Sequence, residues 1–213
     1  MINILLAEDQ ALVRQGIKMM IEQHPSFRVV AEVANGKEAV DAYEKHLVDL
    51  VLMDVRMPVM TGIEATKVIR QRDPKAKVLI LTTFADDEYA MEALKLGALG
   101  YLLKDADAAN LLSSIESCLN GGISIDASVA GKVVPRLINR PGQESSNMEM
   151  VELTSRERSI LQLVGEGKNN QEIAEALHLS IGTVKNHVTV ILQKLGLRDR
   201  TQLAIFAIRN GVV

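Results

Sequence analysis

Residues 50–54, Leu50-Val51-Leu52-Met53-Asp54, place four apolar side chains directly before a carboxylate. An unbroken apolar run of this length is typical of a strand that is buried on both faces of a parallel sheet. The carboxyl ends of such strands are where open α/β sheets carry their chemistry. We therefore expect Asp54 to lie at a functional edge of a sheet.

Three further apolar runs are also followed by polar residues, and they lie at residues 4–7, 78–81 and 100–103. As neighbouring parallel strands, the four runs would bring their carboxyl ends to one edge of the sheet. The polar side chains that follow the runs would then gather there. These side chains are Glu8, Asp9, Asp54, Thr82 and Lys104.

Strand-like and helix-like patterns alternate over the first 120 residues, with turn residues such as Asn35-Gly36 and Gly121-Gly122 between segments. This alternation predicts the α/β class, with a flavodoxin-like, doubly wound, five-stranded parallel sheet. In that strand order, 2-1-3-4-5, the first and third strands are neighbours. The order therefore predicts that Glu8, Asp9 and Asp54 lie together.

Residues 151–213 show no strand pattern and are predicted to form a small all-α domain of four helices. Residues 123–150 are rich in turn formers towards their end and are interpreted as a linker. The predicted boundaries are therefore 1–122, 123–150 and 151–213. Capping residues mark the helix starts of the last domain, namely Thr154, Asn170, Ser180 and Asp199.

The composition is that of a globular chain. With 213 residues and a hydrophobic fraction of 47%, the chain is too apolar for disorder, and its apolar runs fall short of the roughly 18 residues of a membrane span. The start shows no signal-peptide pattern, and the single Cys118 fits a reducing compartment. We therefore expect a cytoplasmic protein with no membrane partner. The formal net charge is −3, and the N-terminal part of the chain is acidic whereas the C-terminal part is slightly basic.

Residues 181–195 combine an apolar stripe with a polar face that carries no carboxylate, formed by Lys185, Asn186, Thr189 and Gln193. A shorter helix precedes this segment, and two helices in this order form the helix-turn-helix pattern. In that pattern the second helix, here residues 181–195, would lie in the major groove of DNA. Asn186 suits adenine, and Lys185 suits guanine or phosphate. Taken alone, the helix is better explained as an amphipathic helix with a solvated face.

Carboxylates that converge at strand ends repel one another unless a cation lies between them. Hard oxygen ligands favour Mg²⁺, and a carboxylate beside Mg²⁺ is a nucleophile towards phosphoryl groups. The transfer spreads negative charge over the phosphoryl oxygens, which an ammonium and a hydroxyl group stabilise. Asp54, with Lys104 and Thr82, thus has the parts needed to form an aspartyl phosphate.

These residues, together with Met57-Pro58 and Gly62, resemble the receiver domain of bacterial two-component response regulators. The resemblance implies that Asp54 accepts a phosphoryl group from a sensor histidine kinase. It also implies that Mg²⁺ is held by Glu8, Asp9, Asp54 and the backbone carbonyl of Arg56. Thr82 and Lys104 would bind the phosphoryl oxygens, and Tyr101 would be an aromatic switch residue.

The C-terminal residues carry a second resemblance. Residues 153–157, 170–174, 183–188 and 199–202 match the LuxR-type DNA-binding domain, so the chain resembles a NarL/LuxR-type response regulator. This implies a transcription factor rather than an enzyme, with promoter DNA as a partner and a homodimer formed on phosphorylation. The implied DNA contacts are Lys185, Asn186 and Thr189 at bases, and Thr183, His187 and Lys194 nearer phosphates.

Two expectations concern the surroundings of these sites. Arg56 and Phe84 lie two positions beyond Asp54 and Thr82, and we hypothesise that they shield the acyl phosphate from water. For dimer contacts we expect the first and fifth helices of the receiver and the final helix of the chain.

Two other functions stay open on the sequence alone. The first is a Mg²⁺-dependent phosphohydrolase with Asp54 as nucleophile, although Arg56 stands where such enzymes carry a general acid. The second is a receiver that acts through protein contacts without DNA. Salt-sensitive DNA binding distinguishes the leading interpretation from this alternative.

Overall fold

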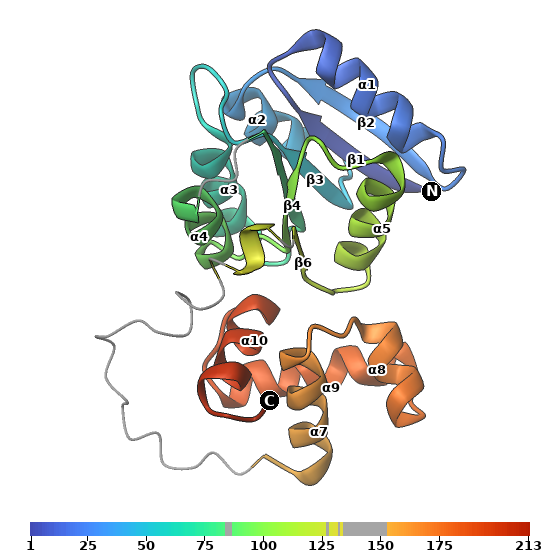
Figure 1. Cartoon of the computed structure of the whole chain (residues 1–213), viewed down its shortest axis with the longest axis vertical. Helices are drawn as coiled ribbons and strands as arrows, with labels where there is room; N and C mark the ends of the chain where they lie inside the picture. Colours follow the sequence, from blue (N-terminus) through green and yellow to red (C-terminus); the bar gives the residue numbers. More distant parts are fainter. Residues whose placement is uncertain (84–86, 127, 132, 134–152) are drawn as a thin grey trace.

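In the computed structural model, the chain is described at residues 1–83, 87–126, 128–131, 133 and 153–213. It comprises a sheet with flanking helices, here called the sheet domain, and four further helices, here called the helical domain (Figure 1). Phe84 and most of the predicted linker lie outside the described residues.

All strands of the sheet run parallel, in the order β2-β1-β3-β4-β5-β6. They are β1 (Ile2–Ala7), β2 (Phe27–Val33), β3 (Leu50–Met53), β4 (Val78–Thr82), β5 (Gly100–Leu103) and β6 (Ser124–Ile125). The predicted order of the first five strands is confirmed, but the predicted count of five is wrong. The sixth strand pairs with β5 at the edge of the sheet, and its two residues are too few to form a recognisable sequence pattern.

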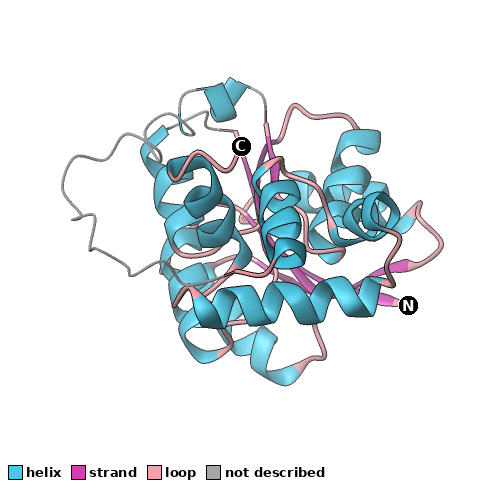
Figure 2. Cartoon of the chain, turned by 90° about the horizontal axis from the view of Figure 1, so that it is seen from below, coloured by secondary structure: helices cyan, strands magenta, loops and turns pink. Residues whose placement is uncertain are grey.

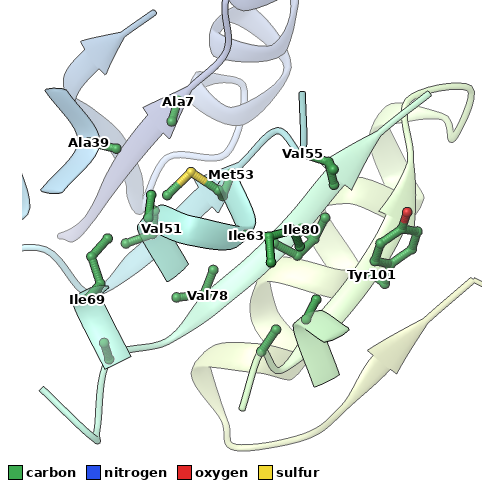
Figure 3. Packing of buried hydrophobic residues seen from close by; sticks show 14 of the residues in the cluster. Ala7, Ala39, Val51, Met53, Val55, Ile63, Ile69, Val78, Ile80 and Tyr101 are labelled. Atoms are coloured by element: carbon green, nitrogen blue, oxygen red, sulfur yellow. The ribbon is translucent and has the colours of Figure 1, made fainter. Parts of the chain in front are cut away.

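Residues of each central strand alternate between two apolar clusters, because successive side chains point to opposite faces of a sheet. Val51 and Met53 enter the cluster that is covered by α2 (Gly36–Lys45), α3 (Gly62–Arg72) and α4 (Asp87–Lys95) (Figure 3). Leu50 and Leu52 enter the cluster that is covered by α1 (Ala11–Glu22) and α5 (Ala108–Leu119). Helices therefore cover both faces of the sheet, as the unbroken apolar runs predict (Figure 2).

The helical domain consists of α7 (Ser155–Gly165), α8 (Asn170–Leu177), α9 (Ile181–Lys194) and α10 (Arg200–Arg209), which share one apolar core. The predicted caps Thr154, Ser180 and Asp199 are confirmed. The predicted cap Asn170 is wrong, because Asn169 caps α8 and forms the capping box with Glu172. In the part of the chain that the structure describes, no helix has the length and apolar character needed to cross a membrane.

The two domains contact each other through the N-terminal end of α10, which lies against α4 (Figure 1). Arg70 on α3 forms an ion pair with Asp199 at 3.2 Å, and the two side chains are only 10% and 11% exposed. The Thr201 hydroxyl donates a hydrogen bond to the carbonyl of Ala98 at 3.3 Å. These contacts hold the helical domain against α3 and against the segment between α4 and β5.

Candidate functional site

The acidic side chains meet because β1 and β3 are neighbours in the sheet. Ala7 is paired with Met53, so the residues that follow them, Glu8 and Asp54, emerge side by side. Glu8 is 1% exposed and Asp54 5% exposed, whereas Asp9 is exposed. One carboxylate oxygen of each residue lies within 4.8 Å of the other two.

Lys104, which follows β5, reaches the two buried carboxylates. Its Nζ lies 2.5 Å from Glu8 Oε2 and donates a hydrogen bond to Asp54 Oδ2 at 2.8 Å. Burial raises the pKa of Glu8 above its ordinary value. Burial also opposes the charge of Lys104, but its close contacts with Asp54 and Glu8 outweigh that effect and raise its pKa. The N–H of Val55 donates to Asp54 Oδ1 at 2.7 Å, which fixes the orientation of this carboxylate.

The donors and charges of this cluster fit a divalent cation. Three carboxylates face a single ammonium group, and Glu8 Oε2 is buried without a well-formed hydrogen bond despite its close contact with Lys104. Carboxylate oxygens are the ligands that Mg²⁺ prefers, with water completing the coordination. Because Asp9 is exposed, the cluster stays accessible to water and to an ion from solvent.

Thr82 ends β4, which lies between the strands that lead to Asp54 and Lys104, and it is fully buried. The N–H of Lys104 donates to the carbonyl of Thr82 at 2.8 Å, which keeps these two strand ends together. The strand ends that carry the five predicted pocket residues are therefore adjacent. Tyr101 on β5 lies in the core and is also fully buried (Figure 3).

The loop after Asp54 packs closely against the start of α3. The N–H of Gly62 donates to the carbonyl of Val55 at 2.9 Å, and a Cβ atom on Gly62 would lie 1.8 Å from the carbonyl oxygen of Asp54. In the same loop, Val59 has a φ of 68°, a left-handed conformation that β-branched residues rarely adopt. The backbone beside the predicted phosphoacceptor is thus tightly constrained.

The second candidate site is the polar face of α9. Lys185, Asn186 and Thr189 are exposed, whereas Val184 and Val188 are buried in the core of the helical domain. The amphipathic pattern predicted for this helix is confirmed except at Ile181, the first residue of the apolar stripe, which is 41% exposed. The three side chains predicted to contact bases lie on the side that faces away from that core.

The predicted phosphate-contacting residues differ in their surroundings. Thr183 and His187 are partly buried beside the exposed face. Lys194 forms an ion pair with Glu157 Oε2 at 2.7 Å, and this hydrogen bond lowers the pKa of Glu157. A contact between Lys194 and DNA phosphate would compete with that ion pair.

Sequence reasoning missed the buried polar contacts of Arg70 and Arg200. Arg70 and its partner Asp199 are 129 residues apart in the chain, so no local spacing indicates their contact. Arg200 is 8% exposed and donates to Asn170 Oδ1 at 3.0 Å, and burial lowers its pKa to about 10. The buried state of Asn170 explains why it is not available as the cap of α8.

Known proteins match nearly the whole chain. A family model described as "Response regulator receiver domain" matches residues 4–116, and one described as "Bacterial regulatory proteins, luxR family" matches residues 151–207. The transcriptional regulatory protein DegU of Brevibacillus brevis is 41% identical over 224 residues, which cover 100% of this chain and 95% of DegU. The transcriptional regulatory protein LiaR of Bacillus subtilis is 41% identical over 213 residues, which cover 100% of both chains. Among solved structures, the response regulator ChrA of a heme-sensing two-component system aligns with a TM-score of 0.53 at 31% identity, covering 100% of this chain and 98% of that chain.

Proposed function

The chain belongs to the NarL/LuxR-type transcriptional response regulators, and from this premise we propose that phosphorylation of Asp54 controls its binding to promoter DNA. The observation that carries the proposal is the buried cluster in which Lys104 contacts both Glu8 and Asp54 at the carboxyl ends of parallel strands. Our proposed domain division is a receiver at 1–122, a linker at 123–150 and a DNA-binding domain at 151–213, although the first residues of the linker pair with the receiver sheet as β6.

In the proposed transfer, a carboxylate oxygen of Asp54 attacks the phosphorus of a phosphohistidine on a sensor kinase. The new O–P bond forms as the P–N bond breaks, and the electron pair of that bond returns to the imidazole. Lys104 and Thr82 bind the phosphoryl oxygens, and Tyr101 is the switch residue that responds to Thr82. When bound by Glu8, Asp9, Asp54 and the carbonyl of Arg56, Mg²⁺ supplies further positive charge at the phosphoryl oxygens.

The surroundings of Asp54 favour a regulatory acceptor over a hydrolytic enzyme. A phosphohydrolase needs a general acid near the nucleophile, and Arg56 cannot fill that role because a guanidinium group keeps its proton. The exposed, carboxylate-free face of α9 favours DNA binding over a receiver that acts through protein contacts alone. We place this activity in the cytoplasm, where the buried Cys118 stays reduced.

On DNA, α9 is proposed to lie in the major groove with Lys185, Asn186 and Thr189 at base edges. Thr183, His187 and Lys194 lie nearer the phosphates. The test is selection of duplexes from a random DNA library by the chain after treatment with a small acyl phosphate donor and Mg²⁺. Enrichment of one sequence only after that treatment, with affinity that falls as salt rises, is the expected result. Equal recovery of all sequences in both samples would contradict the proposal.

Replacing Lys185 with alanine should weaken binding of the phosphorylated chain to the enriched duplex about tenfold, since a good contact to a base edge is worth about 1–3 kcal/mol. Fluorescence anisotropy at fixed salt measures the loss. The control is Lys45→Ala, which removes the same charge from the exposed surface of α2 in the receiver. A Lys185→Ala chain that binds as tightly as the Lys45→Ala chain would exclude α9 as the reading helix.

The docked domains in this structure represent the proposed resting state. The base-reading side chains are exposed to solvent, but Lys185 lies near the receiver, since burial and then the charge of Lys185 lower the pKa of Lys77. Docking does hold α10 against α4, and this keeps α10 from contacting a second copy of the chain. We propose that phosphorylation of Asp54 favours an undocked state in which two copies pair, because one phosphoryl group biases a two-state receiver.

The face of α1 supports a homodimer. Leu12 and Met19 are 84% and 70% exposed, and their spacing of two helical turns puts them on one side of α1. Gly16 lies between them, and a Cβ atom added there would have no neighbouring atom within 4 Å, so a partner helix can approach closely. We propose that this face, with α5 and α10, forms the contacts of a dimer on two DNA half-sites.

Replacing Asp199 with asparagine should raise the DNA affinity of the unphosphorylated chain about tenfold, which corresponds to the loss of about 1.4 kcal/mol of docking free energy. Asparagine caps a helix as well as aspartate does, so α10 keeps its start while the partner of Arg70 loses its charge. Asp41→Asn, which breaks an exposed ion pair with Lys37, is the matched control. An Asp199→Asn chain with unchanged affinity in the same anisotropy assay would show that this ion pair does not restrain the helical domain.

A further inference from the structure

The guanidinium group of Arg56 lies over the aromatic ring of Tyr89, with 5.5 Å between its central carbon and the ring centroid. This distance is within the roughly 6 Å over which a cation is attracted by the face of an aromatic ring. Arg56 is exposed, whereas Tyr89 is half-buried and packs against the core cluster on its side of the sheet. The ring is therefore the fixed partner, and the arginine is the group that it holds.

The topology places this contact beside the phosphorylation pocket. Arg56 belongs to the loop that leaves β3, directly after Asp54 and Val55, whereas Tyr89 belongs to α4, which the chain enters from β4. Because β3 and β4 are paired neighbours, this contact joins the segments that follow the strand ends carrying Asp54 and Thr82. Arg56 therefore belongs to the edge of the sheet where the acyl phosphate would form.

Three side chains of the pocket are buried, whereas Asp9 is exposed. Glu8 is 1% exposed, Asp54 is 5% exposed and Thr82 is fully buried. Water that attacks a phosphoryl group on Asp54 must therefore approach from the carboxyl edge of the sheet, where Asp9 is exposed, rather than through the packed faces of the sheet. A side chain held across this edge controls the approach of water.

From this geometry we propose that Tyr89 is a positioning residue that holds Arg56 over the pocket and slows hydrolysis of the phosphoryl group on Asp54. The inference rests on the proposed function, because it requires the aspartyl phosphate. In the hydrolysis, the oxygen of water forms a bond to phosphorus as the bond from phosphorus to the Asp54 oxygen breaks. The electron pair returns to the Asp54 carboxylate, and the proton lost by water passes to the released phosphate or to solvent.

The position of Tyr89 gives this shield a link to the rest of the chain. Tyr89 lies near the start of α4, and the same helix contacts α10 of the DNA-binding domain. A movement of α4 that releases α10 would also move the ring that holds Arg56. The ring that holds Arg56 and one of the contacts that dock the helical domain thus belong to the same helix.

The experiment compares the decay of the phosphorylated full-length chain in four variants and the parent. Each chain is phosphorylated with a small acyl phosphate in Mg²⁺ buffer, the donor is removed, and the remaining phosphoprotein is followed by phosphate-affinity electrophoresis. Tyr89→Leu removes the π face but keeps an apolar side chain, and Tyr89→Phe keeps the face and serves as the matched control. Arg56→Met removes the charge but keeps the backbone carbonyl, and the fourth variant combines Arg56→Met with Tyr89→Leu.

We expect Tyr89→Leu and Arg56→Met to shorten the lifetime about threefold each, in line with the modest strength of an exposed cation–π contact. The double variant should decay no faster than either single variant, because both changes remove one interaction. Tyr89→Phe should decay like the parent, since it keeps the face that holds the guanidinium group. If the Tyr89 ring only stabilised the core, Arg56→Met would leave the lifetime unchanged. The effects of Arg56→Met and Tyr89→Leu would then also not overlap in the double variant.

Three results would overturn the inference. They are a Tyr89→Leu chain with the lifetime of the parent, a Tyr89→Phe chain that decays as fast as Tyr89→Leu, and a double variant in which the two effects multiply. A parent chain that takes up no phosphoryl group would overturn the proposed function and this inference together. One experiment therefore distinguishes failure of the proposed function from failure of the inference about Tyr89.

Discussion

Replacement of Asp54 by alanine is expected to abolish phosphorylation of the chain by a small acyl phosphate in Mg²⁺ buffer. In the proposed transfer Asp54 supplies the nucleophilic oxygen, and neither of the other two carboxylates of the cluster has the same position. Glu8 is nearly as buried and contacts the same ammonium, but it follows β1 rather than β3, so its oxygens take a different position in the pocket. Asp9 is exposed and is not held by Lys104 in the way that Asp54 is. Uptake of labelled phosphate, and its release by hydroxylamine as expected for an acyl phosphate, measure the outcome.

The control for this experiment is Asp9→Asn, which keeps the side-chain shape but weakens the proposed Mg²⁺ site. This variant should still be labelled, at a lower rate and with a higher requirement for Mg²⁺. The Asp54→Ala chain should stay folded, because the change removes one of three carboxylates that repel one another and leaves Lys104 paired with Glu8. Equal labelling of the Asp54→Ala and parent chains would contradict the assignment of Asp54.

The sequence predicts the sheet and its chemical edge because both depend on local patterns. A run such as residues 50–53 is buried on both faces, and the residue after it must then emerge at the carboxyl edge. The order of the strands follows from short connections and a single switch point. These rules were sufficient to bring Glu8, Asp54 and Lys104 together, and the structure gives the distances between them.

The contacts that sequence reasoning missed depend on tertiary packing. Ser124 and Ile125 become a strand only because the edge of β5 is available to pair with them. The choice of Asn169 over Asn170 as a cap does carry a local signal, since Glu172 stands at the third position after Asn169. The ion pair between Arg70 and Asp199 has no such signal, because it joins two domains whose arrangement no periodicity encodes.

Replacement of Gly62 by alanine should destabilise the receiver by about 3 kcal/mol or more, at the upper end of the usual cost of overpacking. Helix propensity alone predicts that this change stabilises the receiver, because Gly62 is the first residue of α3 and alanine favours helix. Sterics decide, since the new Cβ would lie 1.8 Å from the carbonyl oxygen of Asp54 and 2.8 Å from Cγ of Met53. The backbone oxygen cannot rotate away as a flexible side chain can, so the peptide that carries Asp54 must shift. Urea unfolding followed by circular dichroism measures the loss of stability.

Gly16 provides the matched control for this substitution. It lies inside α1, and a Cβ there meets no atom within 4 Å, so Gly16→Ala should stabilise the receiver by about 0.5–1 kcal/mol. The same chemical change thus has opposite expected effects at two helical glycines of one domain. Because the shift caused by Gly62→Ala begins at the carbonyl of Asp54, labelling by the phosphodonor should fall even under conditions in which the variant remains folded. A Gly62→Ala chain with the stability and labelling rate of the parent would show that the loop after β3 can relax without moving Asp54.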